Sequence, residues 1–457
     1  MARKNRRKER LVAWIIAVIG LLFIGTVLLF TFLALKKPVS DAISQLVSDN
    51  EIEEEPEAEE EIAETEVSDN GISEESIDAI FGDVGENEEE TEIDDGEDEL
   101  TLQAREIVDQ MTLEQQVDQL FFVTPEALTG VDIATAAGET THNALKEHTV
   151  GGIILMGQNI VDPEQLTTMT KNLQSYSEEE ISLPLFIAVD EEGGRVLRIA
   201  SNSSFDLKET PPMAEIGETD DSANAYEAGN YIGTYLKDYG VNVDFAPDAD
   251  VITESENKVI GDRSFGKNPD MVAEYAVQYI NGLHDAGVVG CPKHYPGHGG
   301  TKEDTHSSFA YNNDTWSELE ESELVPFIAL INNGCDMMMV SHVSLPEVTG
   351  DDIPASMSGI LITNKLRLEL LYTGIVITDS INMGAIANKY DVDEASVEAL
   401  KAGVDMILLS KGFDKAYEGV MTAISEGTLS EERIAESATR VVRRKLKFSK
   451  ENESVGE

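Results

Sequence analysis

The sequence predicts an α/β fold, a (β/α)8 barrel of the TIM type, over residues 101–450. Short apolar segments alternate there with amphipathic helical patterns, as they do when parallel strands are joined by crossover helices. The segments are apolar at nearly every position, which is typical of a sheet buried on both faces. The length of this region suits a barrel, which takes about 250 residues and more with insertions.

Seven strand candidates are clear and an eighth is less clear. The clear ones are Gly152–Met156, Leu185–Val189, Val241–Ala246, Val288–Cys291, Met337–Val340, Ile375–Thr378 and Met406–Leu409. The helical patterns between them include Ser222–Leu236, Pro269–Ala286, Glu318–Asn332 and Glu394–Ala402. Polar residues gather directly after the strand candidates, at the end of a barrel where active sites lie.

The first 35 residues predict one transmembrane helix. Six basic residues within residues 1–10 precede a charge-free apolar run over residues 11–35, and about 20 apolar residues span a bilayer. A cleaved signal peptide, the alternative, has an apolar core of about 7–15 residues and a small-residue cleavage site. Because basic residues stay in the cytoplasm, we expect a single-pass signal-anchor in the cell membrane, with the rest of the chain outside.

Residues 36–100 predict an acidic, disordered linker. From residue 38 onward this stretch has no lysine or arginine and is dense in aspartate and glutamate, so its charges repel one another and it has little apolar surface to bury. Its simplest role is to hold the barrel away from the membrane; a specific acidic binding segment is the alternative. Residues 451–457 are expected to form a short C-terminal tail.

Composition argues against nucleic acid as a partner and against a disulfide. The net charge of −55 argues against nucleic acid. The two cysteines, Cys291 and Cys335, lie in apolar strand-like runs, so we expect buried thiols rather than a disulfide. We expect a monomer that uses neither a cofactor nor a metal.

One loop carries most of the chemistry. It runs from Lys293 to His306, reads KHYPGHGGTKEDTH, and holds three of the seven histidines. Its glycines allow a tight approach to a ligand, and Asp304 can orient and tune His306. A later strand candidate ends in Asp379. A histidine-rich loop and a carboxylate, each directly after a strand, predict an active site on the barrel rim.

These residues resemble the family 3 glycoside hydrolases, in the β-N-acetylglucosaminidase branch. The loop from Lys293 to His306 matches the signature of that branch, which usually has Phe where Tyr295 stands and Ser where Thr305 stands. Four further motifs match in the family's order, at residues 111–120, 189–198, 261–266 and 376–384. The resemblance spans residues 102–447 and implies the barrel fold and a retaining mechanism.

The resemblance implies catalytic roles for three residues. Asp379 would be the nucleophile that forms a covalent glycosyl-enzyme; a plain helix-capping role is the alternative. Two-domain members of the family draw the acid/base from a second domain, and we expect no second domain here. His306, oriented by Asp304, is therefore expected to be the acid/base, because an imidazole can both donate and accept a proton near neutral pH.

Sugar-binding roles carry over position by position. The implied ligand-binding residues are Asp190, Arg198, Arg263, Lys293 and His294. A structural ion pair with Asp262 or Asp270 is the alternative for Arg263. Charged groups that hydrogen-bond to neutral hydroxyls are effective in a partly desolvated pocket.

Three nearby residues receive other expectations. Arg195 is expected to be structural, and His342 is expected to be a packed or supporting residue. Glu191 stands where the family often has Gln, and we expect it to add negative charge near the pocket.

The expected function is a retaining β-N-acetylhexosaminidase that releases terminal N-acetylglucosamine from cell-wall glycans. A β-glucosidase, a β-xylosidase or a phosphorylase that uses phosphate instead of water are alternatives within the family. A metal-dependent hydrolase would draw ligands from His294, His298, Asp304 and His306, but their spacing matches no established metal motif. A membrane-anchored glycan-binding protein is the non-enzymatic alternative.

Overall fold

The computed structural model describes residues 98–302, 305 and 310–455. The predicted transmembrane helix at residues 11–35 and the predicted linker up to residue 97 therefore lie outside the described residues. The linker was predicted to extend to residue 100, which was wrong, because Asp98 caps a helix that begins at Glu99. Within the described part, no helix is both long enough and apolar enough to cross a bilayer.

Parallel strands form the centre of the domain. A six-stranded sheet has the order β10, β1, β2, β3, β4, β5, and a parallel pair joins β7 to β9. Single backbone bridges close the two gaps, one between Tyr295 and Val340 and one between Ile377 and Met406. These strands are β1 (Phe121–Val123), β2 (Gly152–Ile154), β3 (Phe186–Val189), β4 (Val243–Asp244), β5 (Val289–Gly290), β7 (Met337–Val340), β9 (Ile375–Thr378) and β10 (Ile407–Leu409). Eight parallel strands thus follow one another around a ring, consistent with the predicted barrel.

Each of the seven clear strand candidates contains one of these strands. The strand that lacked a clear candidate is β1, which follows the helix α3 (Leu113–Asp118) after only two residues. The apolar residues of the two elements run together in the sequence, so no turn signal separates them. A smaller parallel pair, β6 (Ala310–Tyr311) and β8 (Val343–Ser344), lies outside the ring.

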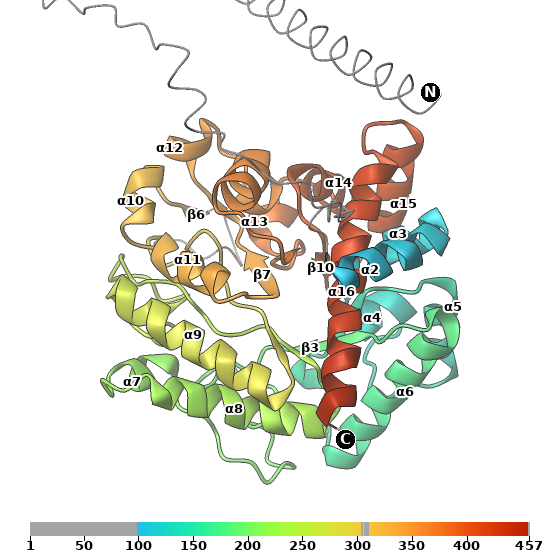
Figure 1. Cartoon of the computed structure of the whole chain (residues 1–457), viewed down its shortest axis with the longest axis horizontal. Helices are drawn as coiled ribbons and strands as arrows, with labels where there is room; N and C mark the ends of the chain where they lie inside the picture. Colours follow the sequence, from blue (N-terminus) through green and yellow to red (C-terminus); the bar gives the residue numbers. More distant parts are fainter. Residues whose placement is uncertain (1–97, 303–304, 306–309, 456–457) are drawn as a thin grey trace, which may run out of the picture. The chain divides into compact units, whose positions relative to one another are not determined.

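Helices surround the strands (Figure 1), and α8 and α9 lie side by side. The longer helices are α2 (Glu99–Gln110), α5 (Glu139–Glu147), α6 (Pro163–Ile181), α8 (Ala223–Asp238), α9 (Pro269–Ala286), α11 (Leu324–Asn332), α14 (Val392–Ala402), α15 (Phe413–Ser425) and α16 (Glu431–Val455). Short helices are α4 (Pro125–Thr129), α7 (Met213–Gly217), α10 (Trp316–Glu320), α12 (Pro346–Thr349) and α13 (Gly384–Ala387).

The pattern predicted as one helix over Glu318–Asn332 is two helices, α10 and α11. The prediction of a single helix was wrong because Pro326 lies within it. Proline lacks an N–H and is tolerated only in the first turn of a helix, so a new helix begins at Leu324, two residues before the proline.

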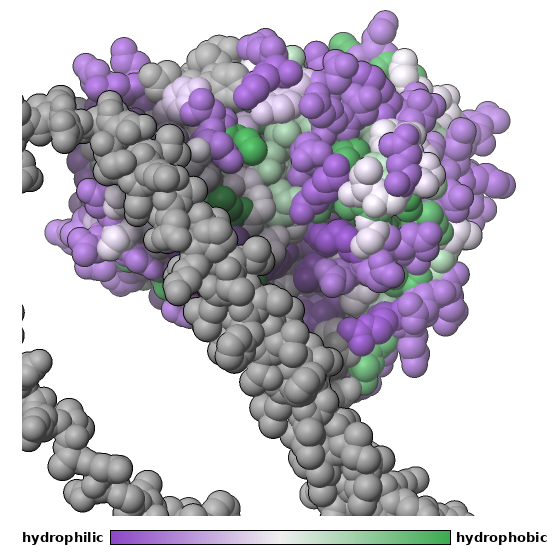
Figure 2. Space-filling model, turned by 90° about the horizontal axis from the view of Figure 1, so that it is seen from above, coloured by the Kyte–Doolittle hydropathy of each residue, from purple (hydrophilic) through white to green (hydrophobic). Residues whose placement is uncertain are grey.

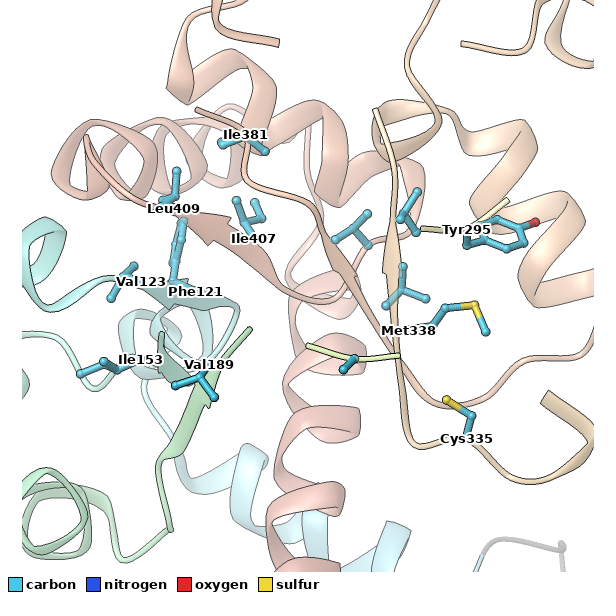
Figure 3. Packing of buried hydrophobic residues seen from close by; sticks show 14 of the residues in the cluster. Phe121, Val123, Ile153, Val189, Tyr295, Cys335, Met338, Ile381, Ile407 and Leu409 are labelled. Carbon is cyan, nitrogen blue, oxygen red and sulfur yellow. The ribbon is translucent and has the colours of Figure 1, made fainter. Parts of the chain in front are cut away.

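Two layers of apolar packing hold the barrel together. Alternate residues of all eight strands, such as Phe122, Phe186 and Met337, form one buried cluster inside the ring. Their strand neighbours, such as Phe121 and Val123, pack outward against the helices (Figure 3). Burial on both faces is what the uniformly apolar strand candidates predicted. On the face shown in Figure 2, hydrophilic residues predominate and hydrophobic residues form small areas between them.

Helix α16 is tied to the start of two strands. Asp405 precedes β10 and accepts hydrogen bonds from Ser437 (2.6 Å) and Arg440 (3.0 Å). Asp336 precedes β7 and forms salt bridges with Arg444 (3.0 Å) and Lys447 (2.8 Å) of the same helix. The helix continues to residue 455 and so includes most of the segment that was predicted as a C-terminal tail.

Candidate active site

A cavity of 460 Å³ lies at the carboxyl ends of the strands. Its lining brings together the six described residues that the sequence predicts for the site: Asp190, Arg198, Arg263, Lys293, His294 and Asp379. Asp190 directly follows β3 and Asp379 directly follows β9. Parallel strands end at a common rim, so residues far apart in the sequence meet there.

His306 and Asp304 lie outside the described residues. Thr305, which stands between them, is buried. Its hydroxyl lies 2.9 Å from Nε2 of His298, and its carbonyl accepts a hydrogen bond from the backbone N–H of Ala385. Thr305 is therefore held by two contacts, one to His298 of its own loop and one to Ala385 in the segment that follows Asp379.

Asp379 is half-buried and held at the cavity wall. Its backbone N–H donates to Val340 of the neighbouring strand (2.9 Å), and its Oδ1 accepts from the N–H of Ser380 (2.7 Å). Burial alone would raise the pKa of this carboxyl, but the imidazoles of His294 and His342 and the Ser380 N–H hold the pKa below its usual value. Asp379 is therefore ionised at neutral pH, as a nucleophile must be.

His342 supports the turn that carries Asp379. It is buried; its Nε2 donates to the carbonyl of Ser380 (3.0 Å), and its Nδ1 lies 2.8 Å from the hydroxyl of Ser356. These contacts agree with the supporting role expected for His342.

A buried charge network forms one side of the cavity. Lys293 Nζ lies 2.9 Å from Asp190 and 2.5 Å from Glu192. Arg263 binds Glu192 through both Nε (2.7 Å) and Nη2 (2.8 Å). Burial alone would raise the pKa of Glu192, but the two cations lower it below its usual value. Arg198 lies at the edge of the network, 3.5 Å from Asp190.

Glu192 is a cavity residue that the sequence reasoning missed. The signal was present: side chains alternate in direction along an extended chain, so if Asp190 points into the cavity after β3, Glu192 does so as well. Glu191 then points away. Glu191 does not line the cavity.

Glu191 instead holds the backbone of its own loop. Its carboxylate is fully buried and accepts hydrogen bonds from the N–H groups of Arg198 (2.5 Å), Ile199 (3.0 Å) and Ala200 (2.8 Å). The hydroxyl of Tyr235 adds a fourth bond at 2.8 Å. This carboxylate therefore determines the path of the chain that presents Arg198.

Arg263 and Arg195 both form ion pairs, and neither is the pair that was considered for Arg263. Arg263 pairs with Glu192 and lies 3.5 Å from Asp248, so the alternative pairing with Asp262 or Asp270 was wrong. Arg195 takes Asp262 instead, at 2.8 Å, and donates to three backbone carbonyls between residues 258 and 260. These bonds agree with the structural role expected for Arg195.

His294 presents one ring nitrogen to the cavity. Its Nδ1 donates to Asp250 at 2.7 Å, which leaves Nε2 unprotonated, 3.5 Å from Arg263. Burial, chiefly, and the nearby arginine lower the pKa of His294 to about 4. The ring is therefore neutral at physiological pH, and its Nε2 can accept a hydrogen bond from a ligand hydroxyl.

Asp248, Asp250 and His294 place three ligand atoms within 4.8 Å of one another, a grouping that could in principle hold a metal. Arg263 lies 3.5 Å from Asp248 and 3.5 Å from His294, so a fixed positive charge already stands beside them. Burial and the Asp250 carboxylate raise the pKa of Asp248 to about 8, against the opposing effect of Arg263. His298, proposed for the alternative metal site, lies within hydrogen-bond distance of Thr301 and Thr305 through its two ring nitrogens. This donor set fits a hydrogen-bonded network better than a metal centre.

Comparisons with known proteins agree with the geometry. The model of the glycosyl hydrolase family 3 N-terminal domain matches residues 112–444. The chain is 35% identical over 295 residues to a beta-hexosaminidase of Nitrosomonas eutropha, a match that covers 63% of this chain and 82% of that relative. It is 30% identical over 332 residues to beta-hexosaminidase A of Pseudoalteromonas piscicida, covering 68% of this chain and 56% of that relative.

A solved structure is similar as well. It is a glycoside hydrolase family 3 beta-N-acetylglucosaminidase from Paenibacillus sp. str. FPU-7, with a TM-score of 0.69 and 35% sequence identity. The similarity covers 74% of this chain and 63% of that one. This chain thus spans less than two thirds of the length of the Pseudoalteromonas and Paenibacillus relatives.

Proposed function

This chain belongs to glycoside hydrolase family 3, and on that premise we propose that it is a retaining β-N-acetylhexosaminidase. The substrate is a glycan with a terminal, non-reducing N-acetylglucosamine, and fragments of the cell wall are its source. One observation carries the proposal: an ionised Asp379 lies in the same cavity as the five predicted sugar-binding residues. The similarity to beta-hexosaminidases supports the choice of sugar.

The first chemical step forms a covalent intermediate. The Asp379 carboxylate attacks the anomeric carbon, and the bond from that carbon to the leaving oxygen breaks. Protonated His306 donates its proton to the leaving oxygen, so the aglycone departs as a neutral alcohol. Because the pKa of Asp379 is held below its usual value, the nucleophile needs no prior deprotonation at neutral pH.

The second step releases the sugar. Neutral His306 takes a proton from water as the water oxygen attacks the anomeric carbon, and the bond to Asp379 breaks. Asp304 orients the His306 ring and favours its protonated form. The cycle ends with free N-acetylglucosamine and both catalytic groups in their starting states.

The charge network binds the sugar while these steps proceed. Asp190 and the Nε2 of His294 accept hydrogen bonds from hydroxyls, and Lys293, Arg198 and Arg263 donate them. Because Glu192 already balances Lys293 and Arg263 inside the barrel, the cations are held in position before the substrate arrives. Such preorganisation lowers the reorganisation cost of the transition state.

The N-terminal sequence supports a location for this activity. We propose that residues 11–35 anchor the chain in the cell membrane and that residues 36–97 act as an acidic spacer. The enzyme would then work on the outer side of the membrane, where cell-wall glycans occur.

The function is tested with the full chain purified in detergent. Aryl β-glycosides of N-acetylglucosamine, glucose and xylose are compared, with and without phosphate. We expect the N-acetylglucosaminide to be hydrolysed best, with no sugar phosphate formed. Asp379→Asn should remove nearly all turnover while the protein stays folded, and a fluorinated sugar inactivator should label Asp379. Faster cleavage of the glucoside, or labelling of Asp190, would refute the assignment.

A further inference from the structure

Glu323 is a buried carboxyl group that the mechanism does not use. It stands immediately before α11 and is fully buried. One oxygen accepts a hydrogen bond from the hydroxyl of Thr253 at 2.9 Å, and the other accepts from the side-chain amide of Asn312 at 2.8 Å. Thr253 lies in the loop after β4, and Asn312 lies just after β6, so this one group joins segments that are distant in the sequence.

The glycine-rich loop packs directly on the same carboxyl group. A Cβ atom on Gly297 would lie 2.6 Å from the Glu323 side chain, and one on Gly300 would lie 2.6 Å from its Oε1. The backbone N–H of Gly300 also lies near enough to the carboxyl to oppose the rise of its pKa. Only glycine allows this approach, because any larger residue would displace the loop from Glu323.

This loop leads to the predicted acid/base pair. The ring of His298 lies 2.9 Å from Thr305, which stands between Asp304 and His306 in the sequence. The amide of Asn257, from the same loop as Thr253, donates to the carbonyl of His298 at 2.8 Å. The loop of residues 297–301 is therefore joined to Thr305 through the ring of His298.

We propose that Glu323 is a positioning residue that holds the Gly297–Thr301 loop in place and thereby places the acid/base segment. The proposal rests on the proposed function, because it assumes that His306 and Asp304 perform acid/base chemistry. Glu323 itself does not line the cavity of the candidate active site.

The neutral acid is the form that fits this location. Burial, chiefly, and the carboxylates of Asp250 and Asp314 raise the pKa of Glu323 to about 8, against the opposing effects of the Thr253 hydroxyl and the Gly300 N–H. In the described part of the chain, no lysine, arginine or histidine forms a salt bridge with Glu323. Lys302, on the packed loop, pairs with Glu254.

A pH dependence follows. Above pH 8 the buried carboxylate would face Asp250 and Asp314 without a compensating cation, and the loop would loosen around it. The free energy of unfolding changes in the same direction. The folded-state pKa of Glu323 is raised from 4.5 to about 8, so the stability that the protonated group contributes is complete at low pH and is lost as the pH rises from 4.5 to about 8. Activity that depends on the loop should decline as the pH rises through about 8, when Glu323 ionises in the folded chain.

The test compares the full chain with Glu323→Gln and Glu323→Ala, using an alkyl glycoside whose departure requires protonation. Gln cannot ionise, and like the protonated acid it offers one acceptor oxygen and one donor. Its oxygen can accept from Asn312 and its amide N–H can donate to the Thr253 hydroxyl, so Glu323→Gln should match the natural chain at pH 7. The ratio of its kcat/KM to that of the natural chain should then rise about tenfold by pH 9, because a group with a pKa of about 8 is roughly nine-tenths ionised there. Taking the ratio cancels the titration of His306, which is common to both proteins.

Glu323→Ala should lose activity at every pH, by about 100-fold, as displaced catalytic groups do. Glu321→Gln, two residues away and exposed, is the matched control and should follow the natural chain throughout. Hydrogen exchange of residues 295–302, corrected for the intrinsic effect of pH, should increase in Glu323→Ala, and in the natural chain at pH 9, but not in Glu323→Gln.

Superimposable pH profiles for the natural chain and Glu323→Gln would overturn the proposal. Unchanged exchange in Glu323→Ala would overturn it as well. If the natural chain cleaves no β-glycoside at any pH, the proposed function fails, while the exchange measurement still decides whether Glu323 holds the loop.

Discussion

Glu192 and Glu191 are adjacent buried carboxylates with opposite orientations, which makes them a matched pair for mutation. Glu192 faces the cavity and binds Lys293 and Arg263. Glu191 faces the backbone of residues 198–200. Replacing each with Gln keeps its size and removes its charge, so the difference between the two variants isolates the charge in the cavity.

The cost of Glu192→Gln follows from the burial of its partners. The side chains of Glu192, Lys293 and Arg263 are 1%, 3% and 11% exposed, so water screens the unbalanced charge poorly. Breaking a buried ion pair costs about 3–5 kcal/mol, and we expect about 3 because Gln keeps one acceptor oxygen. With an unfolding entropy of about 2.1 cal/mol/K per residue, this corresponds to a decrease of about 4 °C in Tm.

Glu192→Gln should also lower kcat/KM, because the two cations that lose their partner bind the substrate. Lys293 and Arg263 both line the cavity, and Glu192 is the carboxylate that bridges them. A small displacement of binding groups can cost about 100-fold in kcat/KM. Glu191→Gln should cost about 1–3 kcal/mol of stability, because a buried amide N–H loses its acceptor. Its kcat/KM should fall much less than that of Glu192→Gln, because the Glu191 carboxylate does not face the substrate and sets only the path of the chain that presents Arg198, at the edge of the network.

The assay combines thermal unfolding with steady-state kinetics on an aryl N-acetylglucosaminide. Glu192→Gln with the kcat/KM of the natural chain would refute the reasoning that this carboxylate positions the two cations. An equal kinetic loss in both variants would show that the difference in orientation has no consequence for binding.

Three further predictions concern other parts of the chain. His306→Ala should reduce kcat/KM by about 100-fold or more for poor leaving groups and far less for activated aryl groups. Asp304→Asn should give a weaker version of this pattern, and chelators should have no effect on activity. Equal losses across all leaving groups would instead indicate a binding role for His306. Lys445 is fully buried against Gln119 (2.8 Å), and burial lowers its pKa to about 7. Because the unfolded chain keeps this proton to higher pH, the natural chain should gain about 1.4 kcal/mol of stability per pH unit from pH 7 toward pH 10. Lys445→Met should be about 1 kcal/mol more stable than the natural chain at pH 7, equal to it near pH 8 and less stable at pH 10; thermal melts at these three pH values check this. Protease added to intact cells should cut within residues 36–97 and release the barrel, whereas a protected barrel would contradict the external location.

The sequence by itself determined the class of fold and six of the charged or polar residues that line the cavity. Uniformly apolar strands such as 337–340 and 375–378 could be predicted because both faces of such strands must be buried. Asp190, Lys293 and Asp379 could be assigned to one site because each follows a parallel strand, and parallel strands end at one rim. These inferences depend only on local pattern and on a rule that holds for every barrel.

Only the tertiary structure decided which charges meet. Arg263 binds Glu192, 71 residues away, rather than its sequence neighbours Asp262 and Asp270, because the barrel brings the β3 and β4 loops together. Nothing in the sequence around Glu323 predicts that Gly297 and Gly300 pack against its side chain. Partner choice depends on distances in space, and burial makes each such choice energetically decisive, because an ion without a partner is costly inside a protein.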